Sequence, residues 1–344
     1  MEASWAKRSD FLDTVQNAWA GRCSRRDPWG RVKGKLEKCQ KIIKVWVRKT
    51  VHATENQIQE KSRKLVNIQM ENGDSARKEE AMIKGEINDL LEQEEAKWKQ
   101  RAKEDWLRHE DRNTKYFHAC ATQKRRRHLV EQITNEEGIM CCTPDSIEGA
   151  FVNYYSKLLT SARSHNVEVC MSAMEGKVTM EMNACLMAAF TTSKVKQELD
   201  QMAPFKAPGP DGFIVEFYQQ NWTTVGPEVC EVALHFLNSG HMDSAINATN
   251  IALIPKVKNP NSVTEFQPIS LCNVLYKIVS KVLVNRLKVI LPLVISPNQS
   301  VFLPGRLITD NILAAYETLY TMHTRLWSKM GIKLDMSKTY DRVE

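Results

Sequence analysis

Apolar residues recur at alternating steps of three and four along much of the first hundred residues. The first stripe runs through residues 31–70 and includes Val32, Leu36 and Trp46. Because steps of three and four place side chains on one face of a helix, this stripe predicts one long helix. A second stripe predicts another helix over residues 75–107.

The short segment between the two stripes carries helix stop and start signals. Gly73 can end a helix in a left-handed conformation, and Asp74 or Ser75 can cap the N-terminus of the next one. Two helices joined by so short a turn pack antiparallel, so the sequence predicts a long helical hairpin near the N-terminus. In that hairpin the basic residues 22–49 would lie beside the basic residues 97–127.

Shorter elements follow residue 128. Residues 129–134 and 139–142 flank a turn and predict a β-hairpin, Pro144 opens an amphipathic helix, and residues 161–176 have no period and are interpreted as a linker. Farther along, the pattern predicts helices over 194–202, 213–222, 227–238, 272–290 and 309–327, and strands over 250–256 and 332–335. The predicted fold class is therefore α+β and mostly helical.

The composition is that of an ordinary globular protein. Hydrophobic residues make up 42% and charged residues 26%, which excludes collagen-like, mucin-like and wholly disordered chains. No apolar run approaches the roughly 20 residues of a membrane span, and charged residues among the first 19 leave no signal-peptide core. The nine cysteines form no CxxC pair and indicate reduced thiols. We expect an intracellular protein, nuclear or cytoplasmic, without a membrane partner.

The positive charge is concentrated in the first part of the chain. Residues 1–130 hold 30 Lys and Arg against 20 Asp and Glu, a net of +10, whereas the 344-residue chain has a net charge of +7, which leaves −3 for residues 131–344. This asymmetry predicts a boundary near residue 130. The expected regions are a basic helical region at 1–130, a small hairpin-plus-helix region with a linker at 131–190, and a third region at 191–344.

Residues 112–128 form the densest basic cluster. They hold six Lys and Arg and no acid, interleaved with Tyr116 and Phe117. Basic groups neutralise phosphates and aromatic faces can stack on bases, so nucleic-acid contact is predicted for Arg112, Lys115, Lys124, Arg125, Arg126 and Arg127. A nuclear-localisation signal in the last four residues, or a merely solvated charged face, are the alternatives.

Five motifs follow one another in the second half of the chain. They are Lys206-Ala-Pro-Gly-Pro-Asp-Gly212, Ile251-Ala-Leu-Ile-Pro-Lys256, Pro268-Ile-Ser-Leu-Cys-Asn-Val-Leu-Tyr-Lys-Ile278, Pro304-Gly-Arg-Leu-Ile-Thr-Asp-Asn-Ile-Leu313 and Lys333-Leu-Asp-Met-Ser-Lys-Thr-Tyr-Asp-Arg-Val343. Each alone is weak, because turns rich in proline and strands that end in aspartate are common. In this order they resemble the reverse transcriptase of plant LINE-type, non-LTR retrotransposons, over residues 190–344 and more weakly over 98–160.

The resemblance implies part of a right-hand polymerase, namely the fingers and the first strand of the palm. It implies an RNA-directed DNA polymerase that uses Mg²⁺, with an RNA template, a DNA primer and deoxynucleotides as partners. Asp335 matches the first catalytic, metal-binding aspartate, and Tyr340 matches the aromatic residue that excludes ribonucleotides. Lys256 matches a lysine that faces the incoming triphosphate. Lys206 and Arg306 occupy basic positions expected to contact nucleic acid.

The sequence also departs from the family pattern. Gln267 stands at a substrate-facing position where the family usually has arginine, and a neutral amide cannot grip a phosphate as a guanidinium does. The family's second acidic motif does not occur within the 344 residues. We therefore expect a fragment that is inactive by itself. The alternatives are a nucleic-acid-binding remnant without catalysis and a decayed gene without a selected role.

Overall fold

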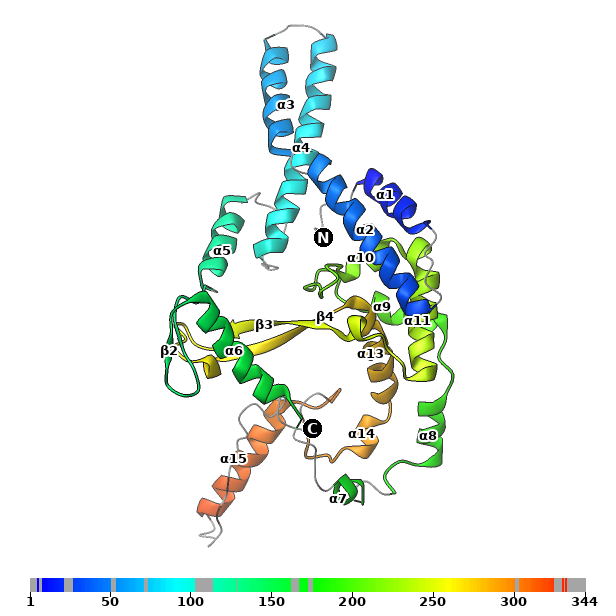
Figure 1. Cartoon of the computed structure of the whole chain (residues 1–344), viewed down its shortest axis with the longest axis vertical. Coiled ribbons are helices and arrows are strands. Elements are labelled where there is room, and N and C mark those ends of the chain that lie inside the picture. Colours follow the sequence, from blue (N-terminus) through cyan, green and yellow to red (C-terminus); the bar gives the residue numbers. More distant parts are fainter. Residues whose placement is uncertain are drawn as a thin grey trace. The chain divides into compact units, whose positions relative to one another are not determined.

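A computed structural model describes residues 5, 8–21, 27–50, 54–70, 74–102, 114–127, 129–161, 167–172, 176–300, 303–324, 330 and 332. The fold is mostly helical with two small antiparallel sheets (Figure 1). The chain divides into two compact units. Unit 1 comprises Met1–Val130, Phe190–Lys256 and Phe266–Val279, and unit 2 comprises Glu131–Ala189, Val257–Glu265 and Ser280–Glu344. Within the described ranges, no helix has the length and apolar character needed to cross a membrane.

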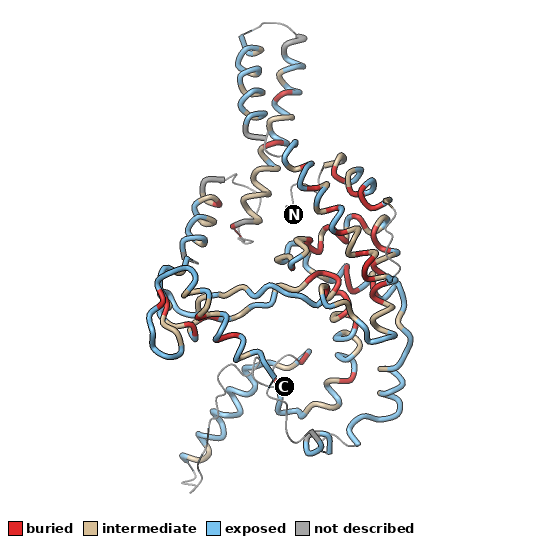
Figure 2. The backbone as a smooth tube through the Cα atoms, viewed as in Figure 1, coloured by how far each residue is buried: buried red, intermediate tan, exposed pale blue. Residues whose placement is uncertain are grey.

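Five helices contribute much of the core of unit 1. They are α1 (Ser9–Trp19), α2 (Pro28–Thr50), α9 (Thr192–Asp200), α10 (Val215–Gln220) and α11 (Trp222–Ser239). Helix α2 packs on α1 and α11, and α11 packs on α9 and α10. Buried residues concentrate on these helices (Figure 2). Residues 1–130 therefore share a hydrophobic core with residues from the 191–344 region.

The apolar stripe of the first predicted helix explains why α2 packs here. Its side chains Val32, Leu36 and Cys39 are buried, and they lie on the face of α2 that contacts α1 and α11. The predicted helix over 31–70 corresponds to α2 and α3 (Thr54–Gln69), and residues 51–53 between them lie outside the described residues.

The helical hairpin consists of α3 and α4 (Asp74–Ala102). Ile83 and Leu90 are among the buried side chains of α4, and the ion pair between Lys61 Nζ and Glu86 Oε2 (2.5 Å) joins the two helices. The last turns of α4 pack on α5 (Thr114–Arg127) instead of on the basic residues 22–49. Among the described parts of the two basic segments the predicted pairing is not found, and residues 22–26 and 103–113 lie outside them.

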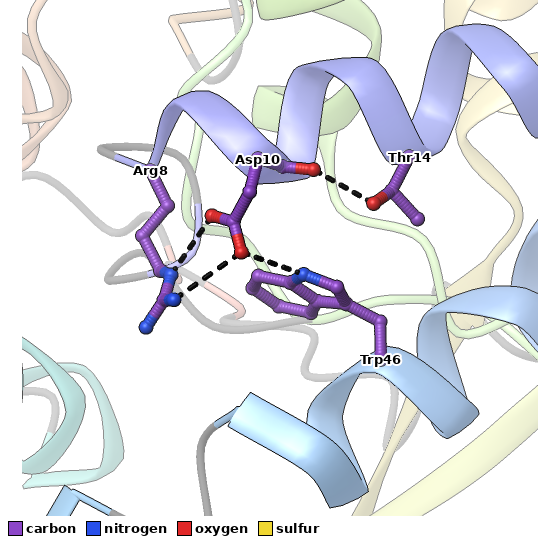
Figure 3. Close-up of polar contacts among 4 residues, drawn as sticks. All are labelled: Arg8, Asp10, Thr14 and Trp46. Atoms are coloured by element: carbon purple, nitrogen blue, oxygen red, sulfur yellow. Dashed lines mark hydrogen bonds and ion pairs between the residues drawn. The ribbon is translucent and has the colours of Figure 1, made fainter.

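Asp10 connects the first turn of α1 to α2 (Figure 3). Its carboxylate accepts hydrogen bonds from Arg8 Nε (3.0 Å) and Nη2 (3.2 Å) and from Trp46 Nε1 (3.0 Å). The guanidinium of Arg8 lies 5.3 Å from the centre of the Trp46 ring. The hydrogen bonds of Arg8 hold the pKa of the Asp10 carboxyl below its usual value, partial burial opposes this, and Trp46 adds to the lowering.

We expect Asp10→Asn to reduce stability at neutral pH by about 0.5–1 kcal/mol, because the exposed ion pair with Arg8 is lost. A carboxyl whose pKa is lowered in the folded state stabilises the protein above its unfolded pKa. That contribution disappears as the pH falls through the folded pKa. Urea denaturation should therefore separate wild type from Asp10→Asn at pH 7, with the two converging as the pH falls through the lowered folded-state pKa of Asp10. Asp13→Asn, on the exposed side of α1, is the control, and a constant Asp10→Asn difference at all pH values would contradict this account.

Unit 2 contains the second, smaller sheet. Strands β1 (Ile133–Thr134) and β2 (Met140–Cys141) pair antiparallel, which confirms the predicted hairpin in a shorter form. The unit's helices are α6 (Pro144–Leu159), α7 (Val167–Ser172), α8 (Met180–Met187), α14 (Leu291–Val294) and α15 (Ile308–Thr324). The backbone amide of Thr134 donates to the carbonyl of Asn261 (2.8 Å), and the turn Val263–Glu265 packs on α6. Helix α7 begins inside the segment that we interpreted as a linker.

Strands β3 (Thr249–Pro255) and β4 (Phe266–Cys272) pair antiparallel and form a two-stranded ribbon. Strand β3 was predicted, but β4 was not, because Pro268 interrupts its pattern. Proline is tolerated where a strand has a free edge, and in a two-stranded sheet each strand has one. The short helix α12 (Ser244–Asn247) precedes β3, and α13 (Val274–Leu287) follows β4.

Candidate functional site

The base of the ribbon is fastened by one buried amide. Asn273 follows the last residue of β4 and is 2% exposed. Its side-chain Nδ2 donates to the carbonyls of Ile246 (3.0 Å), Ala245 (3.3 Å) and Ala248 (3.4 Å), which directly precede β3. Its Oδ1 accepts from the backbone amide of Asp211 (3.1 Å). Asn273 thus joins both ends of the ribbon to the loop of residues 206–212.

That loop fits against Asn273 only because residue 209 is glycine. A Cβ atom on Gly209 would lie 2.5 Å from the backbone nitrogen of Asn273 and 2.6 Å from its Oδ1. Real Cβ atoms do not approach other atoms so closely. The loop is held from a second side by Lys277 of α13, whose Nζ donates to the carbonyl of Ala207 (3.1 Å). The Lys-Ala-Pro-Gly-Pro-Asp-Gly motif is therefore a rigid support for the ribbon.

Asp211 lies in the same loop and is largely buried. Its Oδ1 accepts from the backbone amide of Phe213 (3.1 Å), while Oδ2 is buried without a hydrogen-bond partner among the described residues. Burial raises the pKa of the Asp211 carboxyl to about 6, against the opposing effects of the Phe213 amide and the positive charge of Lys277. Burial also raises the pKa of the neighbouring Tyr218 hydroxyl, and the charge of Asp211 adds to that rise. These groups belong to the support at the base of the ribbon.

Two predicted substrate-binding residues come together at the far end of the ribbon. Gln267 pairs directly with Ile254, and Lys256 follows two residues after Ile254. Lys256 lies in a bend directly after the last residue of β3, so the alternation of side chains along a strand does not fix its direction. Both Lys256 and Gln267 are exposed. The far end of the ribbon therefore carries one exposed cation and one exposed neutral amide.

Arg306 is engaged by the backbone of its own unit. Its Nη1 donates to the carbonyls of Ser296 (2.6 Å) and Gln299 (2.7 Å), and its Nη2 to those of Pro292 (3.3 Å) and Ile295 (3.4 Å). A guanidinium with four carbonyl contacts holds the loop after α14. This geometry favours a structural role for Arg306 over the predicted contact with nucleic acid.

The basic cluster on α5 divides into two kinds of residue. Lys124 Nζ donates to the carbonyl of Ala102 at the end of α4 (2.6 Å) and so joins the two helices. The side chains of Arg125 and Arg126 are exposed. Nearby, the rings of Trp98 and His118 lie 3.4 Å apart between their centres. Arg125 and Arg126 remain available to phosphates, whereas Lys124 fastens α5 to α4.

The other predicted site residues are placed only in part. Lys206 is exposed at the start of its loop. Arg112, Asp335 and Tyr340 lie outside the described residues, and for Lys115 and Arg127 the structure describes the helix but not the side chain. Within the described part of the chain, no group of three or more His, Cys, Asp and Glu residues is arranged to hold a metal ion.

Comparison with known protein families gives a match that includes part of this ribbon. Residues 254–344 match the family model described as reverse transcriptase (RNA-dependent DNA polymerase). The chain carries part of a reverse transcriptase domain. The matched segment begins inside β3, so it includes Lys256, Gln267 and the whole of β4. Arg306 and the structural contacts around it belong to the same reverse transcriptase segment.

A longer stretch of the chain has a relative among transposon proteins. Over 236 residues the chain is 29% identical to the transposon TX1 uncharacterized 149 kDa protein of Xenopus laevis. This alignment covers 68% of the present chain, and the chain spans only 18% of the length of that relative. Similarity therefore extends well beyond the reverse transcriptase segment itself.

Sequence reasoning missed the residues that support the ribbon. Asn273, Gly209 and Lys277 all lie inside recognised motifs, but no role was assigned to them. The proline and glycine content of residues 206–212 did indicate a rigid turn. The partner of that turn is more than 60 residues away along the chain, and no periodic pattern connects the two.

Proposed function

We propose that the chain forms the region before the polymerase, the fingers and the first palm strand of a LINE-type, non-LTR reverse transcriptase, an RNA-directed DNA polymerase. The observation that carries the proposal is the ribbon. The end of β3 and the whole of β4 lie inside the segment that matches the reverse transcriptase family, and Lys256 and Gln267 are both exposed at this end of the ribbon. The similarity to a transposon protein supports the choice of a mobile element.

In this proposal the ribbon contacts the incoming deoxynucleotide. The exposed ammonium of Lys256 would bind the triphosphate through charge-assisted hydrogen bonds. Gln267 could donate one neutral hydrogen bond to the same group, which is weaker than the bidentate contact of an arginine. Tyr340 would lie against the sugar and exclude a 2′-hydroxyl. Asn273 and the loop at 206–212 would hold the ribbon in position from its base.

We further propose that Asp335 contributes to a Mg²⁺ site. A carboxylate oxygen is a ligand that Mg²⁺ prefers, so the residue type fits the metal as one member of a larger ligand set. When bound, the metal would stabilise the charge that develops on the attacking and leaving oxygens of nucleotide transfer. The support for this assignment is the sequence pattern around Asp335.

The test of this function is DNA synthesis directed by an RNA template. A chimera in which the remaining palm and thumb of a related reverse transcriptase follow these 344 residues should incorporate deoxynucleotides, and Asp335→Ala should prevent it.

A second candidate function is nucleic-acid binding without catalysis, and the exposed Arg125 and Arg126 on α5 favour it. We expect replacement of Arg125, Arg126 and Arg127 by Ala to weaken RNA binding and to reduce the salt slope by about two to three units, because fewer counterions are released. Fluorescence anisotropy with labelled RNA at several salt concentrations measures this. Gln123→Ala, an exposed position on α5, is the control, and an unaltered slope in the triple variant would exclude phosphate contacts at this cluster.

A further inference from the structure

Helix α2 is the most basic element of unit 1. Its 23 residues contain eight Lys and Arg and a single acid, Glu37. One face is fixed against α1 and α11 by buried side chains, among them Val32, Cys39 and Ile43. Because that face cannot turn toward solvent, the direction in which each cation of α2 points is set by the fold.

Two of the cations are neutralised inside unit 1. Arg31 pairs with Glu231 of α11, and Lys35 pairs with Glu228 one turn earlier on the same helix. Lys35 Nζ also lies 5.5 Å from the ring centre of Trp19. These pairs join α2 to α11 and use both acidic residues of α11. No acidic residue of α11 is therefore left to neutralise the cations on the solvent side of α2.

Of the six remaining cations, Lys33 is half-buried and the other five are exposed on the solvent side. Lys41, Lys44 and Arg48 follow one another at steps of three and four, so they form a row along one face, and all three are exposed. Lys38 and Lys49 are exposed beside this row. Among the described residues, none of the five forms an ion pair with an acid. We call Lys41, Lys44 and Arg48 the α2 row.

A shallow groove runs beside the row. Its volume is about 420 Å³, and it is lined by Thr14 of α1 and by Lys41, Ile42, Val45, Trp46 and Lys49 of α2. Val45 is 50% exposed and contributes apolar surface to the groove. The groove therefore combines an apolar floor with lysines at its edge.

We propose that the α2 row binds the phosphodiester backbone of a single-stranded nucleic acid. The row spans about 10 Å at 1.5 Å per residue, so its three cations lie along a line that the phosphates of an extended strand can follow. The apolar groove offers a place for a base or sugar next to the phosphates, which a free inorganic anion or an acidic peptide would not use. This inference deepens the proposed function and depends on it for the choice of a nucleic acid as partner.

The test compares two triple variants of the full 344-residue chain. The row variant carries Lys41→Gln, Lys44→Gln and Arg48→Gln. The control variant carries Arg63→Gln, Lys64→Gln and Lys78→Gln, which remove the same charge from exposed positions on α3 and α4 of the same unit. Anisotropy with a labelled single-stranded RNA of about 20 nucleotides is measured against salt concentration, with a DNA strand of the same sequence alongside. Circular dichroism checks that both variants remain folded.

We expect the row variant to bind at least tenfold more weakly at low salt and to lose about two units of the salt slope, at about 0.7 per phosphate contact on a single strand. The control should keep nearly the whole slope. Equal losses in both variants would show that net charge alone attracts the RNA and would overturn the proposal. So would stronger binding to vesicles of anionic lipid than to either nucleic acid. Because this assay needs no polymerase activity, an inactive chimera would count against the proposed function and leave the α2 row untouched.

Discussion

Primer extension on an RNA template is expected from a chimera in which these 344 residues precede the remaining palm and thumb of a related reverse transcriptase. Asp335→Ala should reduce extension to background. The reason is that nucleotide transfer with two metal ions needs carboxylates to hold them, and the resemblance assigns Asp335 as one of these ligands.

The natural control for this experiment is Asp310→Ala in the same chimera. Asp310 is an exposed acid of α15 within the same family match, and no catalytic role is assigned to it. Its replacement should leave extension nearly unchanged. Template-dependent synthesis that persists in the Asp335→Ala chimera would show that this aspartate does not hold a catalytic metal.

Gly209→Ala should be among the most damaging small substitutions in unit 1. The added methyl group would lie 2.5 Å from a backbone nitrogen and 2.6 Å from a backbone carbon of the Cys272–Asn273 link, neither of which can move without displacing the ribbon. Overpacking of this kind costs about 1–3 kcal/mol of unfolding free energy. Loss of the hydrogen bonds of Asn273 would add to that cost.

Gly85→Ala provides a matched control with the opposite sign. Gly85 lies inside α4, and nothing is within 4 Å of the position that its Cβ would take. Alanine should raise helix stability there by about 0.5–1 kcal/mol, since glycine loses more backbone freedom on folding. Urea denaturation followed by circular dichroism measures both variants. Equal midpoints for Gly209→Ala and wild type would disprove the close packing at Asn273.

Local patterns along the chain were sufficient for most individual elements. The helices over 194–202 and 309–327 were located to within a few residues, because their apolar periodicity and capping residues are local signals. Strand β3 was predicted for the same reason. Strand β4 was missed because a proline such as Pro268 argues against a strand in the middle of a sheet. In a sheet of only two strands, each strand is an edge strand and can contain a proline.

The partners of the elements could not be predicted in the same way. The stripe from Val32 to Trp46 is equally compatible with packing on a second helix of a hairpin and with packing on α1 and α11. The structure shows that it packs on α1 and α11. Likewise, nothing in the sequence separates Lys124, which joins α5 to α4, from its exposed neighbours Arg125 and Arg126. Which cation is free depends on distant carbonyls and carboxylates.

The hairpin of α3 and α4 has a consequence for how this protein can diverge. Ile83 and Leu90, two of the buried side chains of α4, are seven residues apart, which is close to two helical turns. If apolar residues of a hairpin follow this seven-residue spacing, each helix can gain or lose seven residues and the apolar side chains still lie on the same face. Its length can therefore drift between related proteins while the core of unit 1 stays intact.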